Sequence, residues 1–395
     1  MDRRGGVARG ALGAVLAVVA VGLCCWLAPA PAAIAADQLT PIGMRVVAAP
    51  VPVEGSDDAF HVVYEIEVTN FTPKAVTLDA LDVLDPDHGK VAASLDAPAI
   101  AARLVVNDPQ AKPGTLGAAQ AGLLYMHLTF PTRPALPRLI EHRLSATLGG
   151  QPVTETAARS TVSAPTSLVV APPLRGERYI AGDGCCDSVR HIRATLPVNG
   201  QRVGAQRFAI DWEQLDPQER IYVGDPKQPA SYVIYGKPIY AVADGVVVAA
   251  VDGLPDSPPG LLPAGLAFEQ ADGNHVVQSL GNGRFALYAH MQPRPVKVHA
   301  GQHVRAGTIL GLVGTSGNSS EPHLHFQVTD GPSPMAANGV PYLLRRFSAT
   351  ERGVSTAAYD RASADGQPLA REPVGGAPVR LRKMPMDLWI VQFAP

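Results

Sequence analysis

The sequence predicts an all-β protein with two structured regions, and three observations lead to this prediction. Its 395 residues are enough for two domains. Glycine (38) and proline (37) make up nearly a fifth of the chain, whereas aromatic residues contribute 6%. This composition favours short strands joined by turns. Apolar and polar residues alternate with a period of two in several segments, as in half-buried strands.

The charge balance argues against one class of function. Charged residues make up 17% of the chain and the formal net charge is -2. No basic surplus is available for phosphate backbones, so we expect no nucleic acid partner. A hydrophobic content of 46% is ample for packed cores.

The N-terminus resembles an export signal. Three arginines in the first nine residues precede an apolar run from residue 11 to residue 27, and Ala33-Ile34-Ala35 suits signal peptidase. We expect residues 1–36 to be a cleaved signal peptide, so that the protein reaches the periplasm or the cell exterior without stable membrane insertion. The alternative is an uncleaved anchor helix. A lipoprotein is disfavoured because Leu23 precedes Cys24, where a small residue is needed.

Cysteine usage agrees with export. Cys24 and Cys25 fall inside the expected signal, which leaves Cys185 and Cys186 in the mature chain. Being adjacent, these two cannot join distant segments. They could form a vicinal disulfide, bind a metal or remain thiols.

Residues 37–170 are expected to form an immunoglobulin-like β-sandwich. Residues 60–69 and 124–130 alternate between apolar and polar side chains, as half-buried strands do. Four histidines lie here without the spacing of metal ligands, and we interpret them as ordinary strand and loop residues: His61, His88, His127 and His142.

A linker is expected at 171–180 and a second β domain at 181–348. Strand candidates there are 239–242, 246–251, 275–279, 285–290 and 323–328. Residues 349–395 are expected to be a tail in which residues 387–393 return as an edge strand.

The most informative motif is His323-Leu324-His325. In a strand, positions i and i+2 point to one face, about 6.5 to 7 Å apart. One imidazole can then bind a metal while the other faces the adjacent water. Taken alone, the pair fits a solvated sheet face better than a metal site. Asp211 and His290, which also end apolar strands, favour a hydrolytic metal site.

An ordered set of motifs from residue 208 to residue 347 resembles the lysostaphin/LytM-type zinc metallopeptidases, which cleave peptides in bacterial cell walls. The set comprises residues 236–245, 283–290, 298–301, 311–318 and 322–326. The resemblance implies a LytM-like antiparallel β peptidase domain over 181–348. It implies Zn²⁺ held by Asp211 and His325, with His290 and His323 as catalytic histidines.

Arg207 departs from this pattern, because it stands where the family's first motif has a histidine. Arginine has no lone pair to donate to a metal. The metal is then lost, or held by two residues and water, or bound by another histidine. We expect His191 to be that substitute, brought opposite residue 207 by a hairpin at Asn199-Gly200. His275 is a weaker alternative.

Two functions follow from these expectations. The first is an exported zinc metalloendopeptidase that hydrolyses peptide bonds in peptidoglycan. The second is a degenerate LytM-like domain that binds the wall or activates a hydrolase.

Overall fold

The computed structural model describes residues 37–294 and 296–394. The expected signal peptide at 1–36 lies outside the described residues. The chain separates into two units, residues 1–39 and residues 40–395, and the boundaries expected near residues 170 and 348 remain predictions. Among the described residues, no helix is long and apolar enough to cross a bilayer.

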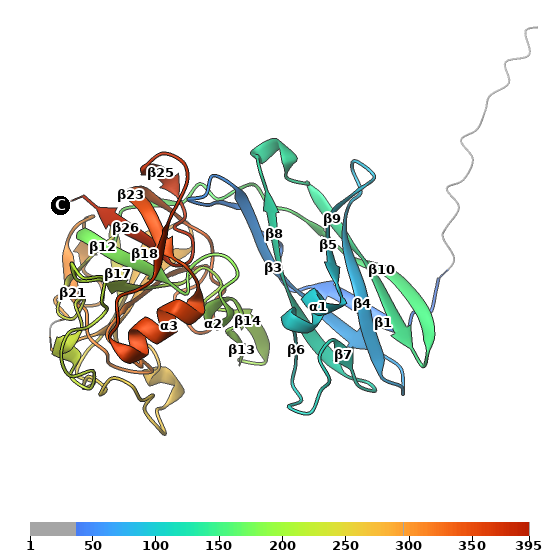
Figure 1. The fold of residues 1–395 in the computed structure, drawn as a ribbon, viewed down its shortest axis with the longest axis horizontal. Coiled ribbons are helices and arrows are strands. Elements are labelled where there is room, and N and C mark those ends of the chain that lie inside the picture. Colours follow the sequence, from blue (N-terminus) through green and yellow to red (C-terminus); the bar gives the residue numbers. More distant parts are fainter. Residues whose placement is uncertain (1–36, 295, 395) are drawn as a thin grey trace, which may run out of the picture. The chain divides into compact units, whose positions relative to one another are not determined.

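Two antiparallel sheets occupy the N-terminal half of the second unit (Figure 1). One sheet has the order β1-β3-β8-β6, with β2 beside β3, and the other has the order β10-β9-β4-β5, with β7 beside β4. Their elements are β1 (Ile42–Val46), β2 (Val53–Glu54), β3 (Phe60–Asn70), β4 (Val76–Asp85), β5 (Lys90–Asp96), α1 (Ala97–Arg103), β6 (Leu104–Val106), β7 (Thr115–Leu116), β8 (Ala121–Phe130), a 3-10 turn (Arg133–Ala135), β9 (Leu139–Leu148) and β10 (Gln151–Thr161).

The two sheets share one hydrophobic core. Tyr64 and Ile66 of β3 belong to it together with Leu78 of β4 and Leu144 of β9. Apolar side chains at every second position of these strands account for this, because alternate residues of a strand face the same side. The core therefore has the two-layer arrangement of a sandwich, and its likeness to an immunoglobulin domain remains a prediction.

The second face of β3 is also covered, which the alternating sequence did not predict. His61, Val63 and Glu65 are buried along with their apolar neighbours. Val63 belongs to a second hydrophobic core that includes Trp212 and Phe326 of the C-terminal half. The expectation of a half-buried strand was wrong here, because a single strand carries no information about what packs on its polar face.

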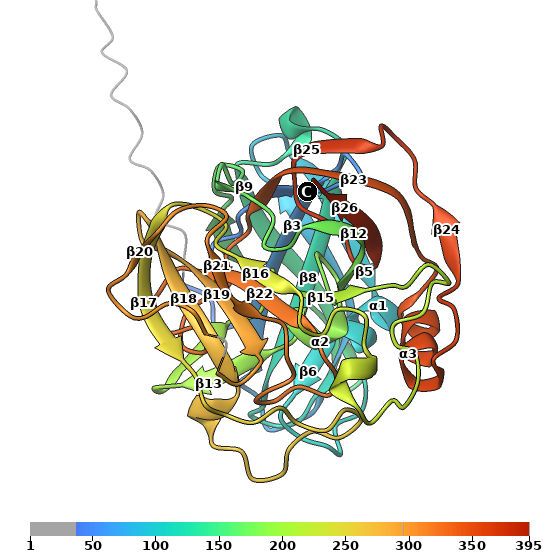
Figure 2. The same ribbon diagram turned by 90° about the vertical axis from the view of Figure 1, so that its left-hand side faces the viewer.

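The C-terminal half is built on a twelve-stranded sheet with the main order β11-β23-β26-β12-β15-β22-β19-β18-β17-β20. Figure 2 shows β17, β18, β19 and β22 side by side. The strands of this sheet are β11 (Val169–Val170), β12 (Gly176–Gly182), β15 (Ile210–Gln214), β17 (Gly245–Val251), β18 (Asn274–Gly281), β19 (Arg284–Met291), β20 (His303–Val304), β22 (Leu324–Thr329), β23 (Leu343–Gly353), β24 (Arg371–Pro373), β25 (Val379–Lys383) and β26 (Trp389–Phe393).

Two short hairpin-like sheets and two helices complete the described C-terminal elements. They are β13 (Thr195–Val198) with β14 (Gln201–Gly204), β16 (Pro238–Tyr240) with β21 (Ile309–Leu312), α2 (Val189–Ile192), α3 (Thr356–Asp365), and 3-10 turns at Pro229–Ser231 and Phe268–Gln270. The five strand candidates after residue 238 correspond to β16, β17, β18, β19 and β22.

Three expectations about the flanks of this region need correction. The expected linker at 171–180 contains the start of β12, a strand inside the large sheet. The segment expected as an edge strand forms β26, which lies between β23 and β12. The expected tail also contains helix α3, which Ser355 caps by accepting a hydrogen bond from the amide of Ala358.

The hairpin at Asn199-Gly200 is present, but it is shorter than expected. It joins β13 and β14 and ends at Gly204. Arg207 lies in a turn before β15, and His191 lies in α2. The sequence analysis assumed that the hairpin places residue 191 opposite residue 207, and the observed register does not do so.

Candidate metal centre

Strand pairing brings Asp211 and His325 together. Asp211 of β15 lies directly opposite His325 of β22 in an antiparallel pair. Directly opposite residues project to the same face of a sheet. The result is a distance of 2.8 Å between His325 Nδ1 and Asp211 Oδ1.

His290 reaches the same face through an unusual backbone conformation. Ala289 of β19 is the residue directly opposite His325, so in a regular strand the next residue would point to the other face. His290 has a φ of 59°, in the left-handed region, which interrupts this alternation. Its ring lies 4.7 Å from the ring of His323 and 5.9 Å from that of His325, between centroids.

His191 approaches Asp211 from helix α2. Its Nε2 lies 3.2 Å from Asp211 Oδ2, and its ring meets the ring of His325 edge-on with centroids 5.1 Å apart. His191 is 5% exposed. The donor atoms of His191, Asp211 and His325 all lie within 4.8 Å of one another.

Hydrogen bonds orient the ring of each ligand candidate. His191 Nδ1 donates to the carbonyl oxygen of Asp183 at 2.8 Å, which leaves Nε2 directed at Asp211. His325 Nε2 donates to Gln327 Oε1 at 2.8 Å, which leaves Nδ1 directed at Asp211. Both inward nitrogens therefore point at the Asp211 carboxylate.

The other two histidines are held in the same manner. His290 Nδ1 donates to the carbonyl oxygen of Ser316 at 2.8 Å, and His323 Nδ1 donates to that of Glu321 at 2.8 Å. Each therefore directs its Nε2 into the cluster. His323 Nε2 lies 3.5 Å from Asp211 Oδ1, and the donor atoms of His290, His323 and His325 also gather within 4.8 Å.

Burial and neighbouring charges shift the pKa values of three members of the cluster. Burial alone would raise the pKa of Asp211, but His191 and His323 hold it well below its usual range. Burial alone would lower the pKa of His191, yet the Asp211 carboxylate outweighs this and raises it to about 9. Burial and the neighbouring His323 and His325 lower the pKa of His290 well below the ordinary range. His290 is therefore neutral.

A cavity of about 300 Å³ opens onto the cluster. Asp211 and His323 line it, and the C-terminal helix α3 contributes Tyr359 and Ser363 to its wall. The sequence analysis missed α3, because nothing in its residues indicates that they return to the site.

The donor set fits a zinc ion. Two neutral imidazoles and a carboxylate are the protein ligands that catalytic zinc sites use. Metal ligands bind in their deprotonated form, so zinc would take the place of the protons through which the inward nitrogens of His191 and His325 contact the Asp211 carboxylate. Gln327 supplies the outer hydrogen bond typical of a metal-bound histidine. It lies two residues after His325 on β22, so strand periodicity could have indicated it.

Two other residues from the sequence analysis lie outside this cluster. Arg207 Nε donates to Glu65 Oε1 at 2.8 Å and its Nη2 to Oε2 at 2.7 Å. His275 Nδ1 donates to the carbonyl oxygen of Gly273, two residues away, at 2.8 Å. Among the groups of residues that could hold a metal in the described chain, none includes His275.

Comparison with known proteins supports a peptidase relationship for part of the chain. Residues 232–337 match the family model described as Peptidase family M23. His290, His323 and His325 lie inside the matched segment, and His191 and Asp211 precede it. A curated relative is the peptidoglycan DD-endopeptidase ShyC of Vibrio cholerae serotype O1, 32% identical over 92 residues. This match spans 23% of the present chain and 17% of that protein.

Solved structures give weaker similarities. The catalytic domain of lysostaphin from Staphylococcus simulans is 21% identical, with 41% of this chain and 88% of that chain covered, at a TM-score of 0.24. A zinc containing peptidase from Vibrio cholerae is 13% identical, with 71% and 80% covered, at a TM-score of 0.22. Scores this low carry no argument about the fold.

Proposed function

Because residues 232–337 belong to peptidase family M23, we propose that this protein is an exported zinc metalloendopeptidase that hydrolyses peptide bonds in bacterial peptidoglycan. One observation carries the proposal. His191 Nε2 and His325 Nδ1 converge on the Asp211 carboxylate, while their other ring nitrogens donate to Asp183 and Gln327.

We assign His191, Asp211 and His325 as the residues that would hold the zinc ion. His191 would take the place that the resemblance reserves for a histidine at position 207. Zinc bound there would acidify a water molecule and polarise the scissile carbonyl.

His290 and His323 would handle protons. Each has Nδ1 engaged with a backbone carbonyl, so its Nε2 is a proton acceptor. His323 lines the cavity and would accept the proton of the attacking water and return it to the leaving amine. His290, neutral because of burial and its histidine neighbours, would receive a hydrogen bond from the reacting groups and remain uncharged.

The relative that acts on peptidoglycan supports the choice of substrate class. The assembled peptidoglycan layer lies outside the cytoplasm, so the proposed substrate agrees with the export signal expected at 1–36.

Zinc analysis and a cell-wall zymogram of the purified protein test the proposal. We expect about one zinc ion per chain and lysis of peptidoglycan, with both lost in Asp211→Asn. In His323→Ala we expect zinc to be retained and lysis lost. Protein that folds, holds no zinc and gives no lysis would refute the enzyme and favour the degenerate wall-binding module.

A further inference from the structure

Two histidines that the sequence gives no reason to pair meet on the covered face of β3 and β8. Val63 of β3 lies directly opposite His127 of β8, so His61 is its diagonal neighbour on the same face. His61 Nδ1 lies 2.9 Å from His127 Nε2. The sequence analysis interpreted both as ordinary strand residues, since their proximity depends on strand register and not on spacing along the chain.

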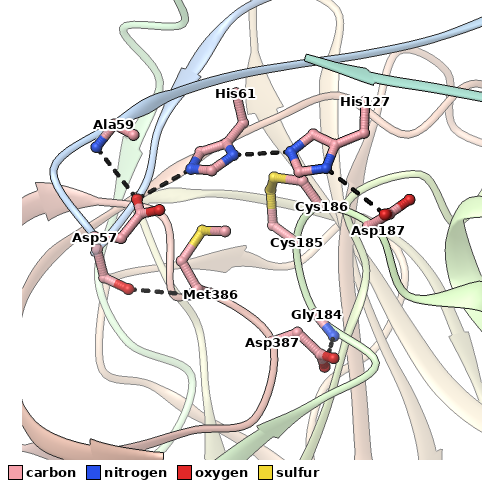
Figure 3. The surroundings of a disulfide bond; sticks show 11 residues. Asp57, Ala59, His61, His127, Gly184, Cys185, Cys186, Asp187, Met386 and Asp387 are labelled. Carbon is pink, nitrogen blue, oxygen red and sulfur yellow. Dashed lines mark hydrogen bonds and ion pairs between the residues drawn. A yellow bond between two sulfur atoms is a disulfide. The ribbon is translucent and has the colours of Figure 1, made fainter. Parts of the chain in front are cut away.

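A carboxylate flanks each histidine on its outer side. His61 Nε2 lies 3.0 Å from Asp57 Oδ1, and His127 Nδ1 lies 3.9 Å from Asp187 Oδ2 (Figure 3). Asp187 is held as an anion by Arg103, whose two terminal nitrogens donate to it at 2.7 and 2.6 Å. Carboxylate, imidazole, imidazole and carboxylate thus form a continuous chain.

The two inner nitrogens of this chain, His61 Nδ1 and His127 Nε2, face each other, while the outer nitrogens are directed at carboxylates. When the outer nitrogens carry the N–H groups, the inner nitrogens present two facing lone pairs. A carboxylate behind a histidine whose other nitrogen faces a ligand partner is the usual outer arrangement of a metal site.

A sulfur atom completes the group. The donor atoms of His61, His127 and Cys186 all lie within 4.8 Å of one another. Cys186 is joined to Cys185 by a disulfide, beneath the two histidines in Figure 3. A cavity of about 700 Å³ is lined by both cysteines and His127, so ions and small reductants in solvent can reach them. The thioether of Met386 lines the same cavity.

We propose that His61, His127 and Cys186 form a second metal site, gated by the Cys185–Cys186 disulfide and selective for a thiophilic transition-metal ion such as zinc or copper. This site is separate from the one assigned to catalysis. Imidazole and thiolate ligands select these ions over magnesium or calcium.

Reduction of the Cys185–Cys186 disulfide requires a dithiol reductant. It would donate two electrons and two protons to the S–S bond, leaving two cysteine thiols and becoming a disulfide itself. The metal ion would then displace the proton of Cys186, and any proton shared between the two inner imidazole nitrogens, into solvent. In the oxidised protein Cys186 has no thiolate to offer, and affinity is low.

Two serine substitutions separate this proposal from general effects of losing the disulfide. Cys185→Ser and Cys186→Ser both remove the bridge, but only the first leaves Cys186 free. Using the full chain and Co²⁺ as probe, we expect Cys185→Ser to bind one more equivalent than Cys186→Ser and to show thiolate-to-cobalt charge-transfer absorption. Equal stoichiometry and no such absorption in folded Cys185→Ser would overturn the site.

The wild-type chain provides a second test that does not depend on those variants. Reduction with a phosphine should add one equivalent of bound Co²⁺, and reoxidation should release it. His127→Gln should abolish this increment while leaving the cobalt bound in the oxidised state unchanged. An increment that persists undiminished in His127→Gln would refute the proposed ligand set.

Discussion

Arg207 and Glu65 form a bidentate salt bridge between the turn before β15 and strand β3. Two nitrogens of the guanidinium donate to the two carboxylate oxygens at 2.8 and 2.7 Å. Arg207 is 6% exposed and Glu65 is 1% exposed. Arg207 is therefore committed to a buried ion pair, and a third nitrogen, Nη1, donates to the carbonyl oxygen of Gly339 at 3.3 Å.

Removing one member of this pair should be costly. Glu65→Gln leaves a buried guanidinium without its anion, so we expect the free energy of unfolding to fall by about 3–5 kcal/mol. The matched control is Glu67→Gln on the same strand, whose partner Arg45 is exposed, with an expected loss below about 1 kcal/mol. Urea unfolding measures both. The double variant Glu65→Leu with Arg207→Met should recover most of the loss, and equal losses in the two single variants would contradict this account.

His191→Ala tests the proposed third ligand. Removing an outer hydrogen-bond partner of a metal site weakens affinity about 10–100-fold, so losing a ligand should weaken zinc binding more than that. His275→Ala is the control, since His275 is similarly buried but bonded to Gly273 away from the cluster. Competition with a chromophoric chelator gives the affinities. Unchanged zinc binding in His191→Ala would show that His191 is not a zinc ligand.

Gln327 should set the tautomer of His325. Gln327→Leu removes the acceptor for Nε2–H, and we expect zinc affinity to fall about 10–100-fold. Gln327→Glu keeps an accepting oxygen at the same place and should retain affinity much closer to that of the wild type. The same chelator competition distinguishes the variants. If the leucine and glutamate variants bound zinc equally, the proposed role for this hydrogen bond would be wrong.

The buried side chain of His142 should make the protein less stable in acid. Burial lowers the pKa of His142 from 6.5 to about 4 in the folded protein, where the ring contacts Tyr64 and the carbonyl oxygen of Ala158. The unfolded chain binds the proton more tightly, so stability should fall as the pH drops from about 6.5 towards 4, by at most about 3 kcal/mol. Unfolding free energies across this range should show a smaller slope in His142→Gln. The exposed His299→Gln should keep the wild-type slope.

Much of the β architecture could be predicted because strand signals are local. Alternation and turn residues indicated β3, β8, β16, β17, β18, β19 and β22. The interior position of β26 could not be predicted, since pairing with β23 and β12 depends on long-range contacts. Helix α3 was missed because its segment is short and rich in alanine and polar residues, and its partners, such as Ile180 and Leu215, are distant in the sequence.

The candidate site could be predicted to a similar extent. Asp211, His290, His323 and His325 lie together, and their roles remain predictions. His191 reaches them by helix α2 and not by the hairpin that suggested it. His61 and His127 were passed over because no sequence pattern states which residues of two strands will be neighbours.

The interior position of β26 has a consequence for the order of assembly. Strand β12 holds β15 on one side, with Gly182 opposite Asp211, and β26 on the other. Every other strand of that sheet is synthesised before β26. Until residue 393 has been made, β12 has an open edge, and its backbone amides and carbonyls on that side lack partners. Completion of the sheet beneath Asp211 must therefore wait until β26 has been synthesised, well over a hundred residues after β12, which places completion of the site after that step of folding.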